Sequence, residues 1–275
     1  MHRSSPIRIV CISDTHRLRA EVPEGDLLIH AGDLTDKGTI AELQEQIDWL
    51  DALPHAHKIA IAGNHDTFLD PRARSTLSAA GCSGRLDWRN IHYLQHRSVI
   101  ITFPERDDRK LTIYGAPQIP ACGGPEHAFQ YPRDQDAWTD TVPAGTDVLV
   151  THTPPRFHLD LPIGLGCEWL LRESWRVRPK LHVFGHVHAG SGQQGIWWDG
   201  CQAAYERICQ RKAGLLDLLN PGHWTDLALL FICGIQSAVW SVLWGGEARG
   251  GTLVNAALMS QETGMLDNIP QVVML

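Results

Sequence analysis

The chain has 275 residues, of which 43% are hydrophobic, and a formal net charge of −7. This length and composition exclude a disordered tail and allow one large globular domain with a well-filled core. The acidic balance excludes nucleic-acid binding through overall basic charge, because phosphate contacts need clustered Lys and Arg. We therefore expect no sequence-specific binding to nucleic acid.

The cysteines and the amino-terminal segment bear on the cellular compartment. The seven cysteines are scattered and form no C-x-x-C pair, a pattern typical of free thiols in a reducing compartment. A short apolar stretch at the amino terminus runs directly into a charged motif, without the features of a signal peptide. The expected location is cytoplasmic, with membrane association left open.

Seven short apolar runs rich in Ile, Val and Leu predict buried strands. In chain order they occupy residues 7–13, 26–32, 57–63, 98–103, 111–115, 147–151 and 180–185. Residues 39–53 predict a surface helix capped by Thr39, because apolar residues recur there at helical spacing. A second helix is predicted at residues 167–177. The alternation of helices and strands indicates an α/β fold.

The later part of the chain departs from this alternation of strands and helices. Residues 117–143 are rich in Pro and Gly and predict a long loop. Residues 202–250 predict a helical, Trp-rich insertion in a single domain spanning 1–275, followed by closing strands at 251–259 and 270–275. Residues 227–244 carry no charge and sit at the lower length limit of a membrane span. Because the chain then returns to the sheet, we favour a buried or docking helix over peripheral membrane contact, and both over a span.

Polar motifs follow five of the predicted strands. Asp14 and His16 follow the first strand, and two positions on an extended segment point to the same side. Gly32 and Asp33 end the second, where Gly permits a sharp turn from which the carboxylate can project. Taken alone, the first motif is better explained as a polar strand end and the second as an Asp turn.

The third strand ends in Gly-Asn-His-Asp. Asn64 offers a carbonyl oxygen to a metal, and His65 is free to act on a substrate. Asp66 could orient His65 or hold its charge. An asparagine turn with an incidental histidine is the alternative.

Two later strands supply imidazoles. His152 ends one of them, and His186 and His188 stand two residues apart in a G-H-x-H motif that ends the other. Imidazole nitrogens at neighbouring strand ends suit a metal site. For His152 alone a hydrogen-bonded core histidine, and for G-H-x-H alone a solvated loop, are the competing interpretations.

Together, the motifs D-x-H, G-D, G-N-H-D, H and G-H-x-H, in this order, resemble the calcineurin-like metallophosphoesterase family. The resemblance covers about residues 7–190 and the closing strands. It implies a four-layer αββα sandwich with a two-metal site at the carboxyl ends of the strands. One metal would be held by Asp14, His16, Asp33 and His188, and the other by Asp33, Asn64, His152 and His186. The mixed oxygen and nitrogen ligands favour Mn²⁺ or Fe, and are compatible with Zn²⁺.

Within the family, residues 151–160, 166–171 and 176–190 look closest to a small phosphodiesterase branch that includes the brain metallophosphoesterase-domain proteins and fungal and bacterial relatives. Residues 114–131 resemble the active-site loop of this branch, although their Gly-rich middle departs from its pattern. Some members replace a metal-binding His with Gly and lose activity. Here both His186 and His188 are present.

The resemblance implies a hydrolase that acts on phosphodiesters, with cyclic nucleotides among the candidates. Two metals would share a hydroxide for in-line attack on the phosphate, and His65, supported by Asp66, would protonate the leaving alkoxide. A phosphomonoesterase, and a weakly catalytic scaffold or membrane-docking module, are the alternatives. The partner is a small phosphoester substrate, and the oligomeric state is left open. Arg17, Arg19 and His127 are weaker candidates for substrate contact, for which a plain surface role is preferred.

Overall fold

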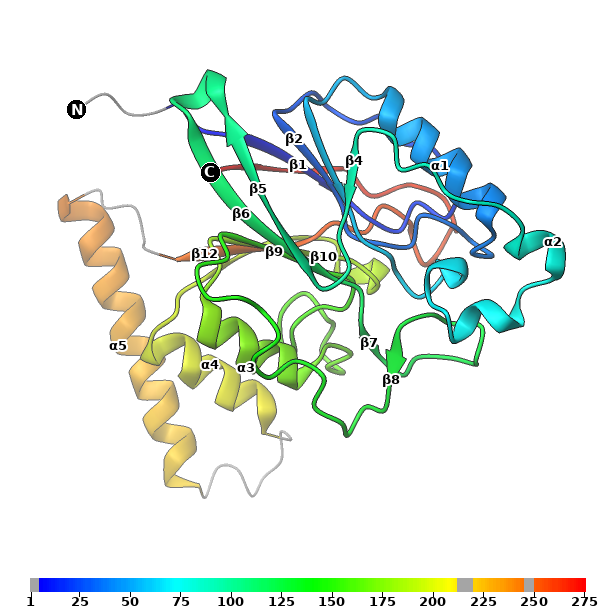
Figure 1. The fold of residues 1–275 in the computed structure, drawn as a ribbon. Helices are drawn as coiled ribbons and strands as arrows, with labels where there is room; N and C mark the ends of the chain where they lie inside the picture. The colour runs from blue at the N-terminus through cyan, green and yellow to red at the C-terminus, as the bar shows by residue number, and fades with distance from the viewer. Residues whose placement is uncertain (1–4, 212–219, 245–249) are drawn as a thin grey trace. The chain divides into compact units, whose positions relative to one another are not determined.

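The computed structural model describes residues 5–211, 220–244 and 250–275, and for residues 237–244 it describes the backbone alone. The chain forms two compact units (Figure 1). We call residues 1–194 and 253–275 the sheet unit, and residues 195–252 the helical unit. Each is described by itself below.

The first sheet of the sheet unit is mostly parallel. Its order is β13 (Gln271–Met274), β1 (Arg8–Ile12), β2 (Leu27–His30), β3 (His57–Ala60) and β4 (Ile91–Tyr93), with only β13 antiparallel to its neighbour. Every residue of β2 is buried, as expected for a parallel strand covered on both faces. The predicted first helix is α1 (Ile40–Ala52), and the Thr39 side chain accepts a hydrogen bond from the Glu42 amide as its cap.

The second sheet has the order β11 (Gly192–Ile196), β12 (Gly251–Asn255), β10 (Leu181–Phe184), β9 (Val148–Thr151), β6 (Arg109–Ala116) and β5 (Arg97–Phe103). Helix α3 (Glu168–Val177) connects β9 to β10 and confirms the second predicted helix. The predicted loop at 117–143 also contains a small pairing of β7 (Ile119–Pro120) with β8 (Gln130–Tyr131). A short α2 (Ala79–Cys82) lies between β3 and β4.

Three apolar clusters hold these elements in layers. The largest lies between the two sheets and includes Ile29 and Ile59 from the first and Ile113 and Val183 from the second. A second cluster contains the buried face of α1 with residues of β1 and β2, and a third contains Leu170 of α3 with residues of β6 and β9. Helix, sheet, sheet and helix therefore follow one another (Figure 1), which confirms the predicted four-layer α/β sandwich.

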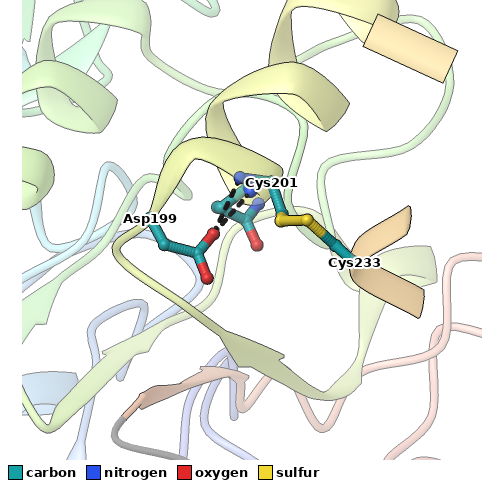
Figure 2. Close-up of a disulfide and its surroundings, with 4 residues drawn as sticks. Asp199, Cys201 and Cys233 are labelled. Atoms are coloured by element: carbon teal, nitrogen blue, oxygen red, sulfur yellow. Dashed lines mark hydrogen bonds between the residues drawn. A yellow bond between two sulfur atoms is a disulfide. The ribbon is translucent and has the colours of Figure 1, made fainter. Parts of the chain in front are cut away.

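The helical unit contains α4 (Gly200–Gln210) and α5 (Pro221–Trp244), which pack against each other. Asp199 caps α4 by accepting hydrogen bonds from the Cys201 and Gln202 amides, and Cys201 forms a disulfide with Cys233 of α5 (Figure 2). Asp226 of α5 also contacts two arginines of this unit, Arg207 and Arg211.

The disulfide corrects the expectation that all the cysteines are free thiols. Cys201 and Cys233 are 32 positions apart in sequence, so no local motif indicates that they pair. Packing of α4 on α5 brings their Cα atoms to 6.4 Å, within the range that a disulfide can span. Cys11, Cys82, Cys122 and Cys167 are free.

Helix α5 carries an exposed apolar stripe, which we define as Trp224, Leu227, Phe231, Ile232 and Ile235. These side chains are between 38% and 71% exposed, and their spacing places them along one face of the helix. The side chains of residues 237–244, the second part of the uncharged segment, lie outside the described residues. Within the described part of the chain, no helix has the length and apolar character required to cross a membrane.

One buried histidine of the core gives a prediction about pH. His182 of β10 is fully buried, and its Nε2 lies 2.9 Å from the Thr151 hydroxyl. Burial, and to a lesser extent His158, lowers the pKa of His182 to about 3 from an ordinary value of 6.5. The unfolded chain therefore takes up this proton first, so the free energy of unfolding falls as pH drops below about 6.5, by up to about 1.4 kcal/mol per pH unit.

Accordingly, His182→Gln should show a shallower loss of unfolding free energy between about pH 6 and pH 4 than the parent chain. Urea denaturation in a chelator at several pH values measures this slope. His92→Gln, at an exposed position, serves as the matched control and should keep the parent slope. Identical slopes in the parent and in His182→Gln would contradict the prediction.

Candidate metal centre

All seven predicted metal ligands meet at one end of the sandwich. They follow strands β1, β2 and β3 of the first sheet and β9 and β10 of the second, at the carboxyl ends where parallel sheets commonly bind ligands. Four of them, Asp14, His16, Asp33 and His186, have left-handed backbone conformations with φ between 43° and 66°. Such conformations are unfavourable for residues other than glycine and concentrate at functional sites.

Asp33 occupies the middle of this group and is 1% exposed. Its Oδ2 lies 3.3 Å from His152 Nε2 of the second sheet and 3.8 Å from His16 Nε2 of the first. Its Oδ1 accepts a hydrogen bond of 2.7 Å from the His65 amide, which fixes the orientation of the carboxylate. One carboxylate oxygen thus faces imidazoles from both sheets, which is the position that a bridging ligand requires.

The first cluster of possible ligand atoms comprises Asp14, His16 and His188, whose atoms lie within 4.8 Å of one another. His188 Nε2 is 3.3 Å from Asp14 Oδ1. The His186 amide donates to both Asp14 oxygens, at 3.1 and 3.0 Å, so the last turn after β10 is attached to the end of β1.

The second cluster comprises Asp33, His152 and His186, and Asn64 joins it. His152 Nδ1 donates to the Ala31 carbonyl at 2.9 Å, so in the neutral ring the lone pair is on Nε2. That Nε2 lies 3.0 Å from Asn64 Oδ1. The Asn64 amide nitrogen is 2.9 Å from His127 Nδ1, which explains why its oxygen faces the cluster.

These contacts test whether the residues fit a cation. Three electron-pair donors, His152 Nε2, Asn64 Oδ1 and Asp33 Oδ2, converge without a hydrogen between them when the imidazole is neutral. Burial would lower the pKa of His152, but the charges of Asp33 and Asp14 raise it to about 9, so the site attracts a positive charge. The buried His16 Nε2 also has no hydrogen-bond partner among the residues that the structure describes. The carboxylate, imidazole and amide donors therefore fit divalent cations.

Two glycines permit the close approach of these segments. Gly32 has φ of +99°, and a Cβ there would lie 2.7 Å from both the Ala62 carbonyl oxygen and His152 Nδ1. A Cβ at Gly63 would lie 2.2 Å from Asp33 Oδ1. Any larger residue at either position would displace the carboxylate or the imidazole.

His65 lies at the edge of the centre. Its Nδ1 donates to the Asp36 carbonyl at 3.0 Å, and its ring is 4.8 Å from the His16 ring. It also belongs to a third group of potential ligand atoms, with His16 and Asp33. The sequence predicts that His65 acts on the substrate. In the structure, His65 lies close enough to the cavity and to Asp33 to contact either a substrate or a metal.

The expectation that Asp66 orients His65 needs correction. The Asp66 carboxylate is fully buried and accepts hydrogen bonds from the Gly63, Leu34 and Thr35 amides and from the Thr35 hydroxyl. It therefore ties the loop after β2 to the loop after β3, and a backbone carbonyl, that of Asp36, orients the His65 ring instead. The spacing in G-N-H-D could not reveal the direction of this side chain.

Two asparagines near the carboxyl terminus, which the sequence analysis missed, hold the loop that carries His186 and His188. Asn255 of β12 is fully buried and donates to the Val187 carbonyl at 2.9 Å and to the Leu159 carbonyl at 3.1 Å. Asn268 donates to the His188 carbonyl at 3.3 Å. A single asparagine in an apolar strand such as residues 251–259 is the only sequence signal for the first of them.

The centre opens into a cavity of about 450 Å³, the usual size of a small-molecule site. Besides five of the residues discussed above, the residues lining the cavity are Cys122, His127, Leu161, Ile163, Leu165, Val187 and Gln261. His127 thus lies where a substrate could reach it. Arg17 and Arg19 instead form ion pairs with Glu42 and Glu45 and are not among the lining residues.

This geometry agrees with a comparison to known protein families. The model of the calcineurin-like phosphoesterases matches residues 7–190, which include every predicted ligand. The chain belongs to the calcineurin-like phosphoesterase family. Its candidate metal centre and its fold are accordingly those of a phosphoester hydrolase family.

Three relatives of this calcineurin-like phosphoesterase show how far the similarity extends. A protein named probable rhamnogalacturonate lyase C, of Emericella nidulans, is 43% identical over 91% of this chain but only 23% of its own length. Human metallophosphoesterase domain-containing protein 1 is 36% identical over 67% of this chain and 61% of its own. A UPF0046 protein of Caenorhabditis elegans is 39% identical, over 68% and 70% respectively. The chain thus spans less than two thirds of the first two relatives.

Proposed function

We propose that this protein hydrolyses phosphodiesters, cyclic nucleotides among them, at a centre of two divalent cations, with Mn²⁺ or Fe as the expected metals. The observation that carries the proposal is the position of Asp33 between two clusters of imidazole and carboxylate donors, next to a cavity. Asp14, His16 and His188 would hold one ion, and Asn64, His152 and His186 the other. Bound cations would supply Lewis-acid activation of a water molecule and of the phosphate oxygens.

The side chains of the protein have separate parts in this reaction. Asp33 and Asp14 place negative charge where the cations bind, and the two sheets keep these carboxylates out of water. His65 has its Nδ1 proton directed to the Asp36 carbonyl, so its Nε2 is the atom that exchanges a proton in the cavity. We assign to it the protonation of the departing oxygen, a role worth about 10² to 10⁴ in rate.

The direct test combines metal content with turnover of two nitrophenyl esters. The purified chain should retain two metal ions by elemental analysis and should hydrolyse methyl 4-nitrophenyl phosphate faster than 4-nitrophenyl phosphate. Preference for the monoester would make the protein a phosphomonoesterase of the same fold. Full metal content without turnover of either ester would overturn the enzymatic proposal and leave a metal-binding scaffold.

We do not extend the proposal to lyase chemistry. The name of the fungal relative describes a protein of which this chain matches only 23%. The donors assembled here, two carboxylates, an amide and imidazoles around one cavity, suit hydrolysis of a phosphoester.

We also propose that the stripe on α5 lies on the surface of a neutral phospholipid bilayer. Trp224 and Trp244 lie near the two ends of the uncharged segment 227–244, a pattern typical of helices at the membrane interface. The one acidic residue of α5, Asp226, is paired with Arg207 and Arg211, so no free charge of this helix opposes the contact. The disulfide joins the opposite side of α5 to α4, so it favours a fixed orientation of the stripe relative to α4.

Accordingly, the full chain should co-sediment with phosphatidylcholine vesicles, and Phe231→Glu should weaken this binding by about tenfold, because it removes one large apolar contact. Ile100→Glu changes a similarly exposed apolar residue of β5, at 62% exposure, and should have no effect. Binding to anionic vesicles alone, or to neither kind, would overturn the assignment of the stripe to a neutral membrane.

A further inference from the structure

The cavity at the metal centre has two chemically different sets of lining residues. Asn64, His65, Cys122 and His127 form a polar wall, which approaches from the loops after β3 and β7. Leu161, Ile163, Leu165 and Val187 form an apolar wall, which comes from the loops after β9 and β10. The catalytic roles assigned above use the polar wall and leave the apolar wall unexplained.

The loop after β9, which carries most of the apolar wall, has a fixed conformation. Asp160 is 2% exposed and accepts hydrogen bonds from the Phe157 amide at 3.1 Å and the Gly166 amide at 2.9 Å, which closes the loop between them. Phe157, Leu159 and Leu161 all have left-handed backbone conformations, with φ of 71°, 52° and 66°. Three such residues in one loop persist only when the surroundings fix them.

Hydrogen bonds fix the position of the apolar wall relative to the metal centre. Asn255 donates to the Leu159 carbonyl and to the Val187 carbonyl, so one buried side chain attaches the apolar loop to the loop that carries His186 and His188. A displacement of the apolar wall would therefore also break a contact of the metal-binding loop. This coupling is expected of a wall that places part of a substrate relative to the cations.

Ile163 is the most exposed member of the wall. Its side chain is 76% exposed, although it lines a cavity next to buried charges. A large apolar side chain in that position gains free energy when an apolar group of a ligand covers it. The four side chains of this wall carry no charge and no hydrogen-bonding group, so they favour an apolar group over a sugar hydroxyl or a second phosphate. Gln261 also lines the cavity and belongs to neither wall.

We propose that the apolar wall binds the retained organic arm of a phosphodiester, and that this arm is apolar or aromatic. The inference rests on the proposed function. Hydrolysis breaks one P–O ester bond, adds a water oxygen to phosphorus and sends a proton to the departing oxygen. That oxygen leaves beside His65 on the polar wall, so the arm that stays on the phosphomonoester product lies across the cavity, on Leu161, Ile163 and Leu165.

If the apolar wall binds the retained arm, the protein distinguishes diesters from monoesters by contact with this wall. A phosphomonoester has no second arm and leaves the apolar wall uncovered, whereas an aromatic diester buries part of it. The protein should therefore prefer diesters with a large apolar retained arm to diesters with a methyl group. Polar arms of the same size should gain nothing from the wall.

The test compares two substrates that share one leaving group, phenyl 4-nitrophenyl phosphate and methyl 4-nitrophenyl phosphate, with the metal-loaded chain. Ile163→Ser should lower kcat/KM for the phenyl ester by about tenfold, mostly through KM, and should leave the methyl ester nearly unchanged. Phenyl phosphate, which carries the retained arm as a product does, should inhibit the parent chain more strongly than methyl phosphate, and Ile163→Ser should remove that difference. Ile100→Ser is the matched control, because it removes an exposed isoleucine of the same unit away from the cavity lining.

The outcomes separate this inference from the proposed function. Turnover of both esters with an unchanged phenyl-to-methyl ratio in Ile163→Ser would overturn the inference and leave the phosphodiesterase proposal intact. An equal loss for both esters would also overturn it, because it would make the wall a support for the metal centre only. If the metal-loaded parent chain hydrolyses neither ester, the proposed function fails and the inference fails with it.

Discussion

Asp33→Ala should lose more metal and more activity than a substitution of any ligand that faces only one cluster. Its carboxylate is the group shared between His16 and His152, so its removal takes a negative charge from both cation positions at once. Because a catalytic metal contributes several kcal/mol of charge stabilisation in the transition state, we expect kcat/KM to fall by about 10³-fold or more. Elemental analysis should show less than one metal ion per chain.

Two further variants make this experiment specific. Asp33→Asn keeps the shape of the side chain and an oxygen for the His65 amide, so a metal loss in this variant reports the lost charge rather than a collapsed loop. Asp36→Ala, an exposed aspartate three positions on that contributes only its backbone carbonyl, should keep its metals and its activity. His188→Ala should lose one ion. Two metals and normal turnover in Asp33→Ala would show that Asp33 is not the bridge.

His65→Ala should keep its metals and become selective for easy leaving groups. If Nε2 of His65 gives a proton to the departing oxygen, its loss matters most when that oxygen leaves as an alkoxide and least when it leaves as a nitrophenolate. We expect a loss of about 10² to 10⁴ in kcat for an alkyl phosphodiester and a much smaller loss for a nitrophenyl one. Steady-state kinetics on the two esters, with metal analysis of the same samples, measures both effects.

His127→Ala is the matched control for His65. His127 lines the same cavity, with its ring 5.0 Å from the His65 ring, but its Nδ1 contacts the Asn64 amide. Its removal should affect both esters alike. An equal loss on both esters in His65→Ala would indicate binding of the transition state rather than proton transfer. Loss of metal would instead make His65 a ligand, as its place beside His16 and Asp33 allows.

The central strands could be predicted because they are covered on both faces. Residues 27–29 and 148–150 are continuously apolar, and they lie in β2 and β9. Strand β11 was missed because its sequence, Gly-Gln-Gln-Gly-Ile, has no apolar run, and as the last strand of its sheet it pairs on one side only. Strand β4 is a three-residue strand at the edge of the other sheet, and its length gives too few residues for a pattern.

The positions of the seven predicted ligands could be inferred from strand ends, since parallel strands bring their carboxyl ends to one edge. The details that depend on side-chain direction could not. The carboxylate of Asp66 faces the backbone of the preceding loop, and Asn255 reaches two carbonyls from distant segments. The Cys201–Cys233 pair also depends on how two helices pack, which no motif in this chain encodes.

The hydrogen bonds of Asn255 set an order of events during synthesis. His186 and His188 leave the ribosome well before Asn255, with the whole helical unit made in between. Until Asn255 arrives, the carbonyls of Leu159 and Val187 lack their donor, and a buried carbonyl without a partner is unfavourable by about 1–3 kcal/mol. The nascent chain is therefore expected to gain its full affinity for metal only after translation has passed the region that the family comparison matches.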